Sequence, residues 1–394
     1  MKSIVLVAVV GVTLAACSGG GDATQPTTLE TTPATAVATT TSATVAPAGG
    51  TEWSVSGALA QIPADGATTF ELTTGDLAAI SELFGVTPPD DLSDVDAAIN
   101  GWLLPLTFPG TPEYRPLPVW VALQEPLVPR NPTDFAELDA LLGWSLAEAD
   151  AFVDYRPPAP GYLVVAHGEF ADDALAGLDE IAPGVATSGP GDDLAVDVTA
   201  IGPLDSLGRS VRLARRDDSI AMSLTTALAE RWLAGDTTTL ADDQRAAAVA
   251  EALDAAGVLT AHVFRNDFWV GSALGATPMS PEVAEQITAA VADVPPFDTV
   301  GIGWAIDDSG RPSAVLAYAP LDGDAAALAA QLEGVFADGE SLIRGFPVAE
   351  VLGAFDPEIV AADGVVTVTY RPVDAFWWTA IQAVYQRDLP FVHG

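Results

Sequence analysis

The three histidines are the first residues to consider for metal or acid–base chemistry, because imidazole binds metal ions and titrates near neutral pH. They are His167, His262 and His393, and no two of them have the i, i+2 or i, i+4 spacing that presents two ring nitrogens to one metal ion. The single cysteine, Cys17, is far from all three in the sequence. We therefore expect no metal site, and we expect the histidines to be hydrogen-bonded structural residues.

Pairs of adjacent aspartates recur along the chain and are the most frequent candidate ligands or catalytic acids. They are Asp90-Asp91, Asp172-Asp173, Asp192-Asp193, Asp217-Asp218, Asp242-Asp243 and Asp307-Asp308. None of them has the spaced oxygens, the glycine and the closing glutamate of a calcium loop. We interpret most of them as helix caps and turns, with calcium binding as the alternative. The fold could still bring two carboxylates together for glycosidase-type hydrolysis.

Motifs for a catalytic nucleophile or a nucleotide are absent from the sequence. There is no Gly-x-Ser-x-Gly elbow, and Ser-x-x-Lys is excluded because Lys2 is the only lysine. Gly301-Ile302-Gly303 lacks the third glycine and the following helix of a dinucleotide-binding fingerprint. We therefore expect no cofactor, and an enzymatic activity is not favoured.

Two groups of residues are candidates for an interaction surface. Four arginines fall within a stretch of eight residues, on an expected strand that ends at the Asp217-Asp218 turn. They are Arg209, Arg212, Arg215 and Arg216. They form either a docking site for an anion or carboxylate, or a strand face paired with neighbouring acids. On the last expected helix, Trp378 points away from the apolar face, and so either contacts a partner or ligand or packs beneath another subdomain.

The hydrophobic pattern predicts the strands and helices that must position these residues. A strand at 69–72 is followed by a helix capped near Thr74, and 118–125 has the pattern of a strand within a proline-rich loop. Residues 240–257 and 280–294 predict amphipathic helices, and 298–320 predicts a hairpin. Hairpins and runs of helices favour an α+β fold with antiparallel sheets and flanking helices.

A strand followed by a helix recurs four times in the second half. The four segments are GYLVVAHGEFADDALAGLDEI (161–181), DDSIAMSLTTALAERWLAG (217–235), RPSAVLAYAPLDGDAAALAAQLEGVF (311–336) and DGVVTVTYRPVDAFWWTAIQAV (363–384). Their pattern predicts an internal duplication of a strand–helix module, with chance similarity among alanine-rich segments as the alternative. We expect an N-terminal α+β subdomain with a proline-rich loop at 51–158, a first α+β module at 159–296 and a second at 297–394.

The N-terminus has the layout of an export signal: Lys2 precedes a short apolar run that ends in small residues. Leu14-Ala15-Ala16-Cys17 resembles the lipobox of bacterial lipoproteins, in which the thiol is lipidated and cleavage leaves cysteine as the new N-terminus. That resemblance implies a signal peptide at 1–16 and a membrane anchor at Cys17, on the extracytoplasmic side of the cell membrane. An ordinary signal peptide beside a free thiol is the alternative.

Composition limits the partners of the exported part. Residues 17–50 are rich in Thr, Pro and Ala, which predicts a disordered tether. The net charge of −39 repels nucleic acid and anionic lipid, so we expect no nucleic-acid partner. The hydrophobic content of 49% is nevertheless sufficient for a folded core.

The whole arrangement resembles a group of actinobacterial lipoproteins with a lipobox, a Thr/Pro tether and an Ala- and Asp-rich ectodomain that ends in a motif like Arg387-Asp388-Leu389-Pro390-Phe391. That resemblance implies no particular activity. Our first hypothesis is a lipid-anchored extracytoplasmic protein that binds an envelope partner without catalysis. The alternatives are a small-molecule binder with a cleft between modules, and an envelope hydrolase that uses paired carboxylates.

Overall fold

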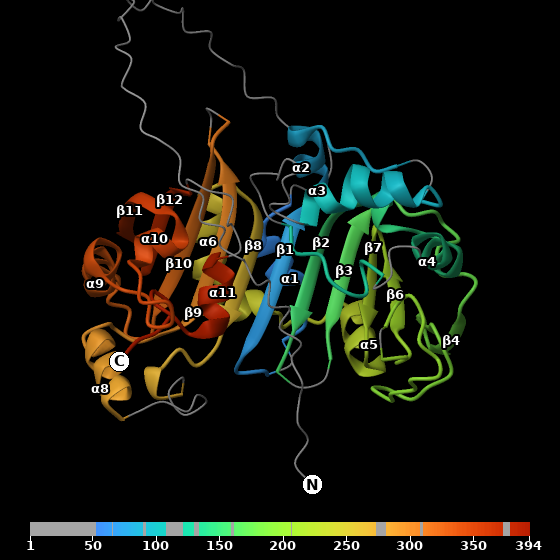
Figure 1. Cartoon of the computed structure of the whole chain (residues 1–394). Coiled ribbons are helices and arrows are strands. Elements are labelled where there is room, and N and C mark those ends of the chain that lie inside the picture. The colour runs from blue at the N-terminus through green and yellow to red at the C-terminus, as the bar shows by residue number, and fades with distance from the viewer. Residues whose placement is uncertain are drawn as a thin grey trace, which may run out of the picture. The chain divides into compact units, whose positions relative to one another are not determined.

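The strands pair into one twelve-stranded antiparallel sheet, in the order β11-β12-β10-β9-β8-β1-β2-β3-β7-β6-β5-β4 (Figure 1). The computed structural model describes residues 53–64, 66–89, 92–107, 121–129, 134–158, 161–205, 207–272, 281–307, 310–372 and 379–394. The expected antiparallel sheet with flanking helices is thus confirmed, as a single sheet.

The strands of the left half of the sheet in Figure 1 come from the C-terminal part of the chain, and β1 joins them to the strands of the right half. The left half contains β8 Val258–Arg265, β9 Phe297–Ile306, β10 Pro312–Pro320, β11 Ala354–Ala362 and β12 Val365–Pro372. The centre and right half contain β1 Phe70–Asp76, β2 Ala149–Arg156, β3 Leu163–Gly168, β4 Asp179–Ala182, β5 Val185–Thr187, β6 Arg212–Arg216 and β7 Ser219–Ser223.

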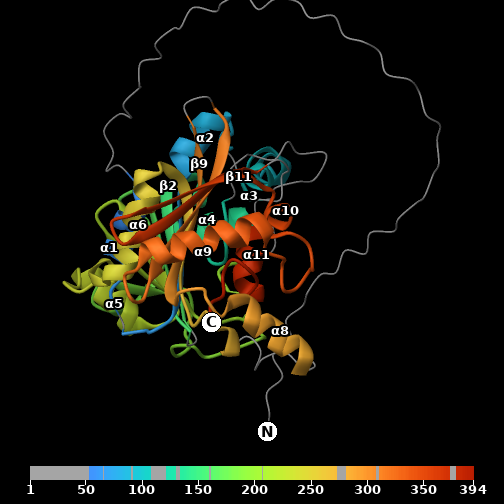
Figure 2. The same cartoon turned by 90° about the vertical axis from the view of Figure 1, so that its left-hand side faces the viewer.

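Helices cover both faces of the sheet, so the molecule has three layers (Figure 2). The first face carries α1 Val55–Gln61, α5 Thr226–Ala234, the short 3-10 helix η4 Leu240–Asp242 and α6 Gln244–Ala255. The second face carries α2 Leu77–Phe84, the π-helical η1 Ala97–Leu103, α3 Leu104–Thr107, α4 Phe135–Leu142, η3 Leu146–Glu148, α8 Pro281–Val291, α9 Ala325–Asp338, α10 Val348–Leu352 and α11 Thr379–Gln386. Because both faces are covered, central strands such as β3 are buried along almost their whole length.

Local sequence explains where several helices begin and end. Asp243 caps α6, since its Oδ1 accepts hydrogen bonds from the amides of Arg245 and Ala246, both at 3.1 Å. Asp76 caps α2 through the amide of Ala79 at 2.8 Å, and Gly85 ends that helix in the left-handed conformation. The predicted helices in 240–257 and 280–294 and the hairpin β9–β10 are confirmed.

The two halves of the sheet follow the same order of connections. From the centre outward, one half runs β1-β2-β3-β7-β6 and the other runs β8-β9-β10-β12-β11. In each half the second and third strands form a hairpin, and the strand added next is the later strand of another hairpin. The halves meet where β1 and β8 pair antiparallel, with Thr73 opposite His262.

Two predicted elements are wrong. Residues 172–177 form turns followed by β4 rather than a helix, because Leu175 has a φ of 71° and cannot continue a right-handed helix. The described part of the expected strand at 118–125 is irregular, and Glu125 precedes Pro126, which has no amide hydrogen for a sheet. Strands from all three expected segments, 51–158, 159–296 and 297–394, belong to the one sheet, and Thr51–Gly394 forms one compact unit.

Candidate functional site

Two acids and an arginine lie together on β1 and β2, near the middle of the sheet. Glu71 is directly opposite Arg156, and Thr73 is directly opposite Asp154. Directly opposed residues of an antiparallel pair point to the same face, so these side chains share one face of the sheet. We define the central cluster as Glu71, Asp154, Arg156, Tyr162 and Tyr385.

Asp154 is enclosed, with 2% of its surface exposed. Arg156 donates to its Oδ2 from Nε at 3.1 Å and from Nη2 at 2.9 Å. Nη2 also donates to the carbonyl oxygen of Glu125 at 2.8 Å. The other carboxylate oxygen, Oδ1, is buried and has no hydrogen-bond partner. Burial raises the pKa of Asp154, whereas the charge and hydrogen bonds of Arg156 act to lower it.

Glu71 is held by the last helix. The hydroxyl of Tyr385 on α11 donates a hydrogen bond to Glu71 Oε1. Burial raises the pKa of Glu71; the Tyr385 hydrogen bond opposes this shift, and the nearby charge of Asp154 adds to it. The two carboxyl groups therefore repel each other electrostatically, and each holds a proton more tightly than an exposed carboxyl group.

Tyr162 adds a second buried polar atom without a partner. The guanidinium carbon of Arg156 lies 5.6 Å from the centre of its ring, in a cation–π contact. Its hydroxyl group is buried and has no hydrogen-bond partner. Burial raises the pKa of Tyr162, and the charge of Asp205 adds to this shift while that of Arg209 opposes it.

Arg209, one of the four candidate arginines, belongs to the surroundings of this cluster. It binds Asp205 through both ends of its fork, with Nε 3.0 Å and Nη2 2.7 Å from Oδ2. Asp205 Oδ1 also accepts a hydrogen bond from the backbone amide of Arg209 at 3.0 Å, so the two residues stabilise the turn that separates them. Because its guanidinium group is paired with Asp205, Arg209 has a structural role in this conformation.

The central cluster is equipped to accept hydrogen bonds and to hold protons. A buried acceptor without a partner costs about 1–3 kcal/mol, which a donor group of a ligand would recover. Two carboxyl groups with raised pKa values could also act as general acids. Within the described residues, no group of three or more His, Cys, Asp or Glu side chains could hold a metal ion.

The histidines lie apart from one another, and each is hydrogen-bonded within the fold. His262 on β8 lies beside the cluster, with Nδ1 3.1 Å from Thr73 Oγ1, and burial lowers its pKa to about 3. His167 Nδ1 lies 2.8 Å from Ser219 Oγ, and burial together with the charge of Arg216 lowers its pKa to about 4. His393 Nδ1 lies 3.0 Å from the carbonyl oxygen of Gly394.

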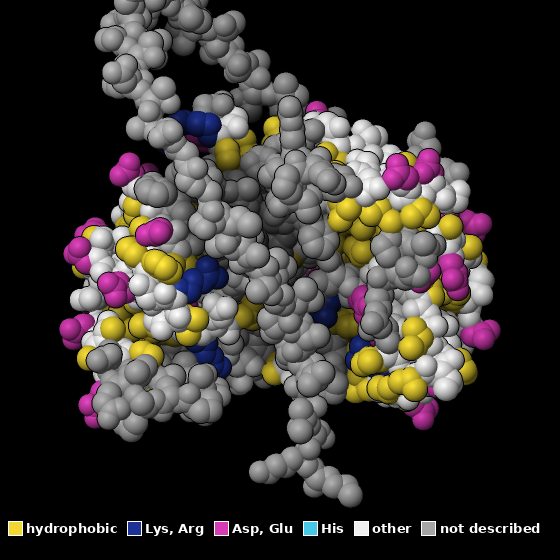
Figure 3. All heavy atoms as spheres, viewed as in Figure 1, with side chains coloured by type: hydrophobic (Ala, Val, Ile, Leu, Met, Phe, Trp, Pro, Cys, Tyr) yellow, Lys and Arg dark blue, Asp and Glu magenta, His cyan; other side chains and the backbone are white. Residues whose placement is uncertain are grey.

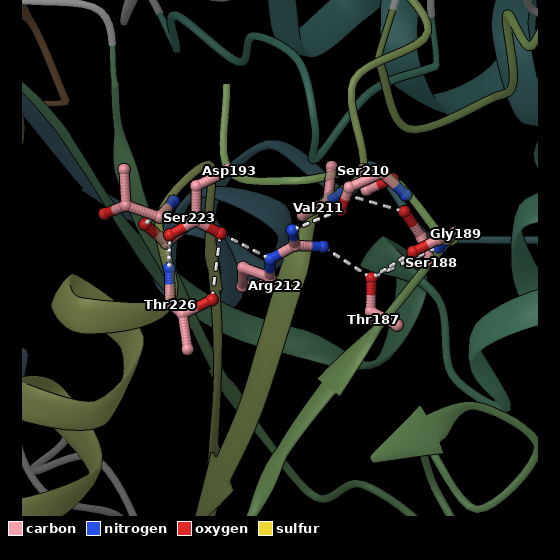
Figure 4. A network of polar contacts seen from close by, with 11 residues as sticks. Thr187, Ser188, Gly189, Asp193, Ser210, Val211, Arg212, Ser223 and Thr226 are labelled. Carbon is pink, nitrogen blue, oxygen red and sulfur yellow. Dashed lines mark hydrogen bonds and ion pairs between the residues drawn. The ribbon is translucent and has the colours of Figure 1, made fainter. Parts of the chain in front are cut away.

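Arg212, on β6, is the centre of a polar network rather than part of an open surface (Figure 4). Its side chain is 3% exposed and donates to Asp193 Oδ1 at 2.8 Å, Thr187 Oγ1 at 2.6 Å and the carbonyl oxygen of Gly191 at 2.6 Å. Asp193 in turn accepts the amide and the hydroxyl of Thr226, the first residue of α5, both at 2.8 Å. Arg212 and Asp193 therefore fasten the loop at 188–210 to the start of α5.

The remaining candidate arginines bind backbone carbonyls. Arg215 donates to the carbonyl oxygens of Phe170 and Ala171. Arg216 donates to the carbonyl oxygen of Trp232 at 2.5 Å and lies 4.5 Å from the centre of its ring. The structure thus spreads the four arginines over separate contacts with acids and carbonyls. Trp378 lies outside the described residues.

Several of the acidic residues highlighted in the sequence have structural roles. Asp217-Asp218 forms the turn between β6 and β7, and Asp242 accepts the backbone amide of Thr239 in a capping box. Asp388, from the C-terminal motif, accepts the amide of Leu342 at 2.6 Å and so fixes the loop after α9. In the view of Figure 1, acidic side chains are spread over both flanks rather than gathered in one patch (Figure 3).

Sequence reasoning missed the central cluster. One signal was present: Asp154 interrupts the apolar run Phe152-Val153-Asp154-Tyr155 in the middle of a strand. A charged residue at such a position is buried unless the strand is at an edge, and a buried charged residue needs a partner.

Comparison with protein-family models, with curated proteins and with solved structures finds no match.

Proposed function

We propose that the chain is a lipid-anchored extracytoplasmic binding protein, attached to the cell membrane through Cys17. The motif Leu14-Ala15-Ala16-Cys17 after an export signal supports the anchor. Among the described residues, no helix combines the length and apolar character needed to cross a bilayer. Cys17→Ser should release the protein from the membrane or stall its processing. A variant that still required detergent for extraction would contradict the anchor.

The folded part, in this proposal, binds a small ligand at the central cluster. The observation that carries it is the pair of buried, unpartnered atoms beside Arg156, which are Asp154 Oδ1 and Tyr162 Oη. A buried polar atom without a partner calls for an explanation, and a donor group of a ligand would supply one here. The cluster lies next to the β1–β8 junction, where a ligand would contact both halves of the sheet.

The ligand class follows from the charges of the site. Two carboxyl groups face one arginine, and the whole chain carries −39, so the site favours a small cation with N–H donors. An ammonium or guanidinium group would donate to Asp154 Oδ1 and lower the pKa of both carboxyl groups. Binding should therefore release protons from the protein.

Calorimetry with arginine amide as the cationic probe, and sorbitol as a neutral one, tests this site. The wild-type protein should bind arginine amide and not sorbitol, and Asp154→Asn should weaken that binding about tenfold or more. Asp150→Asn is the matched control, since Asp150 is an exposed acid on the same strand. Equal binding by both variants, or none by the wild type, would contradict the ligand site and leave the lipid anchor unaffected.

A second candidate function is hydrolysis by paired carboxyl groups. The raised pKa values of Glu71 and Asp154 favour it, because a protonated carboxyl group can act as a general acid. Hydrolysis of a chromogenic glycoside panel that Glu71→Gln abolishes would support it. Turnover unchanged in that variant would exclude Glu71 from the chemistry.

The matching strand orders support an internal duplication. In this proposal, one copy contributes β1-β2-β3-β7-β6 and the other β8-β9-β10-β12-β11, related about the β1–β8 pair. In both halves the helix before the first strand, α1 or α6, packs on the same face of the sheet. An experimental structure in which these strand sets did not superpose would remove the duplication.

A further inference from the structure

The two halves of the sheet differ in where their last helix packs. Helix α5 follows β7 and buries Ala229 and Trp232 against the first face. Helix α11 follows β12 and buries Ile381 and Val384 against the second face. Figure 2 shows α5 and α11 on opposite sides of the strands. On the first face, α5 therefore covers β6 and β7. Helix α11 does not cover β12 on that face, because it packs on the second face.

A groove lies on the first face of β12, between that strand and α6. Its volume is about 340 Å³. Small side chains line it, namely Ala248, Ala252 and Ala255 from α6 and Val365, Thr367 and Thr369 from β12. Because the side chains on both walls are small, a further α-helix could approach the backbone of α6 and β12 closely and pack between them.

Helix α5 shows what such a face accommodates in this fold. It packs on β5, β6 and β7, and it seats Trp232, which is 1% exposed, with Leu228 and Leu233 packed on the same core. One aromatic side chain and two leucines on one helix face are thus sufficient to cover the outer strands of a half-sheet.

The rim of the groove sets the charge of its occupant. Glu251 on α6 and Asp363, at the turn between β11 and β12, line the groove and are exposed. A second copy of this chain, which carries −39, would bring further negative charge to that rim. A partner helix with lysine or arginine beside its apolar face would instead be attracted to it.

We propose that the groove between α6 and β12 docks an amphipathic, basic α-helix of another protein, with an aromatic side chain in the position that Trp232 has on α5. This surface is separate from the central cluster, which lies on the second face. Helix-in-groove recognition of this kind relies on a few apolar anchors spaced along one helix face.

The experiment uses a labelled, stapled peptide of residues 225–235 with Glu230→Lys, so that the probe carries the apolar face of α5 and a basic flank. Fluorescence anisotropy with the full-length protein should show saturable binding with a dissociation constant below about 1 mM. Ala255→Trp, which fills the groove from an exposed position of α6, should weaken binding about tenfold or more. Ala289→Trp, at an exposed position of α8, is the matched control and should leave binding unchanged.

Charge and self-association give two further readouts. Glu251→Gln should weaken binding about threefold, and raising the salt concentration should have a similar effect on the wild type. Absence of saturable binding, or equal weakening by Ala255→Trp and Ala289→Trp, would overturn the proposal. So would sedimentation showing a wild-type dimer that Ala255→Trp dissociates, because the occupant would then be a second copy.

Discussion

Tyr385 donates a hydrogen bond to Glu71, and these residues are 314 positions apart in the sequence. The contact joins the last helix, α11, to the first strand, β1, at the middle of the sheet. It also determines the charge balance of the central cluster, because a donor to Glu71 favours the ionised carboxylate that burial disfavours. The state of this one bond therefore affects both the stability and the proton affinity of the site.

Replacing Glu71 by glutamine should make stability less dependent on pH. Burial raises the pKa of Glu71 above its ordinary value of 4.5, so the folded state binds the proton more tightly than the unfolded state. The contribution of Glu71 to stability is then most favourable below pH 4.5 and declines as the pH rises through the raised pKa. Urea midpoints of Glu71→Gln should exceed those of the wild type at pH 8, and the difference should shrink towards pH 4.

Two variants control this prediction. Tyr385→Phe removes the donor that lowers the pKa of Glu71, so the pH-dependent loss of stability should move to higher pH. Glu82→Gln is the matched control, because it makes the same substitution at an exposed position of α2 and should leave the urea midpoints close to those of the wild type. If Glu71→Gln behaved like Glu82→Gln, the half-buried position of Glu71 would not affect its protonation.

Arg212→Ala should destabilise the protein by about 2–3 kcal/mol, because it removes three charge-assisted hydrogen bonds from a buried position. The loop at 188–210 and the start of α5 should lose protection together, as hydrogen exchange would show. Arg215→Ala is the matched control on the same strand: Arg215 is half-buried and donates to carbonyls, so its loss should cost less than about 1 kcal/mol. Equal free energies of unfolding for the two variants would refute the central role of Arg212.

His262 should remain neutral in the folded protein well below pH 6. Burial lowers its pKa to about 3 from the ordinary 6.5, so the unfolded state binds more protons in this range and stability falls as the pH drops from 6.5 towards 3. The imidazole proton shifts of His262 in NMR spectra should stay constant down to pH 4. His262→Asn should lose less stability between pH 6.5 and pH 4 than the wild type, and identical pH profiles would contradict the burial of His262.

The elements that the sequence predicted correctly are those whose signals are local. Asp243 before an alanine-rich amphipathic stretch marks the start of α6, and the alternating residues around the Asp307–Gly310 turn mark β9 and β10. The prediction of a helix after β3 was wrong. The spacing of its apolar residues fits a helix, but Gly177 has a low helix propensity and Leu175 adopts a left-handed conformation.

The central cluster could not be assembled from the sequence, because its members come from β1, β2, the residue before β3, and α11. Only the strand register places Asp154 beside Thr73, and only the packing of α11 brings Tyr385 to Glu71. The arginines illustrate the converse case. Their sequence spacing predicted either one docking site or one strand face paired with neighbouring acids. Alternation along β6 and the preceding loop instead send them to separate partners: Arg209 and Arg212 pair with acids, and Arg215 and Arg216 bind carbonyls.

Gly301 and Gly303, set apart in the sequence from a nucleotide-binding motif, instead allow α6 to approach β9 closely. A Cβ atom at Gly301 would lie 2.5 Å from Val249 Cγ1 and 2.8 Å from Leu253 Cδ1, and both of these side chains belong to α6. Gly301→Ala should therefore cost about 1–3 kcal/mol, because the helix or its side chains must shift within a packed core. The free energy of unfolding in urea measures this cost.

Gly334→Ala supplies a control of opposite sign. Gly334 is an exposed glycine inside α9, and nothing lies within 4 Å of the position of its missing Cβ. The same substitution there should stabilise the protein by about 0.5–1 kcal/mol, since it only restricts the unfolded chain and improves helix propensity.

The clash at Gly301 has a further consequence: Val249→Ala should offset part of the cost of Gly301→Ala, so the double variant should be more stable than the sum of the two single changes predicts. Strict additivity would mean that α6 does not press on β9 at this glycine.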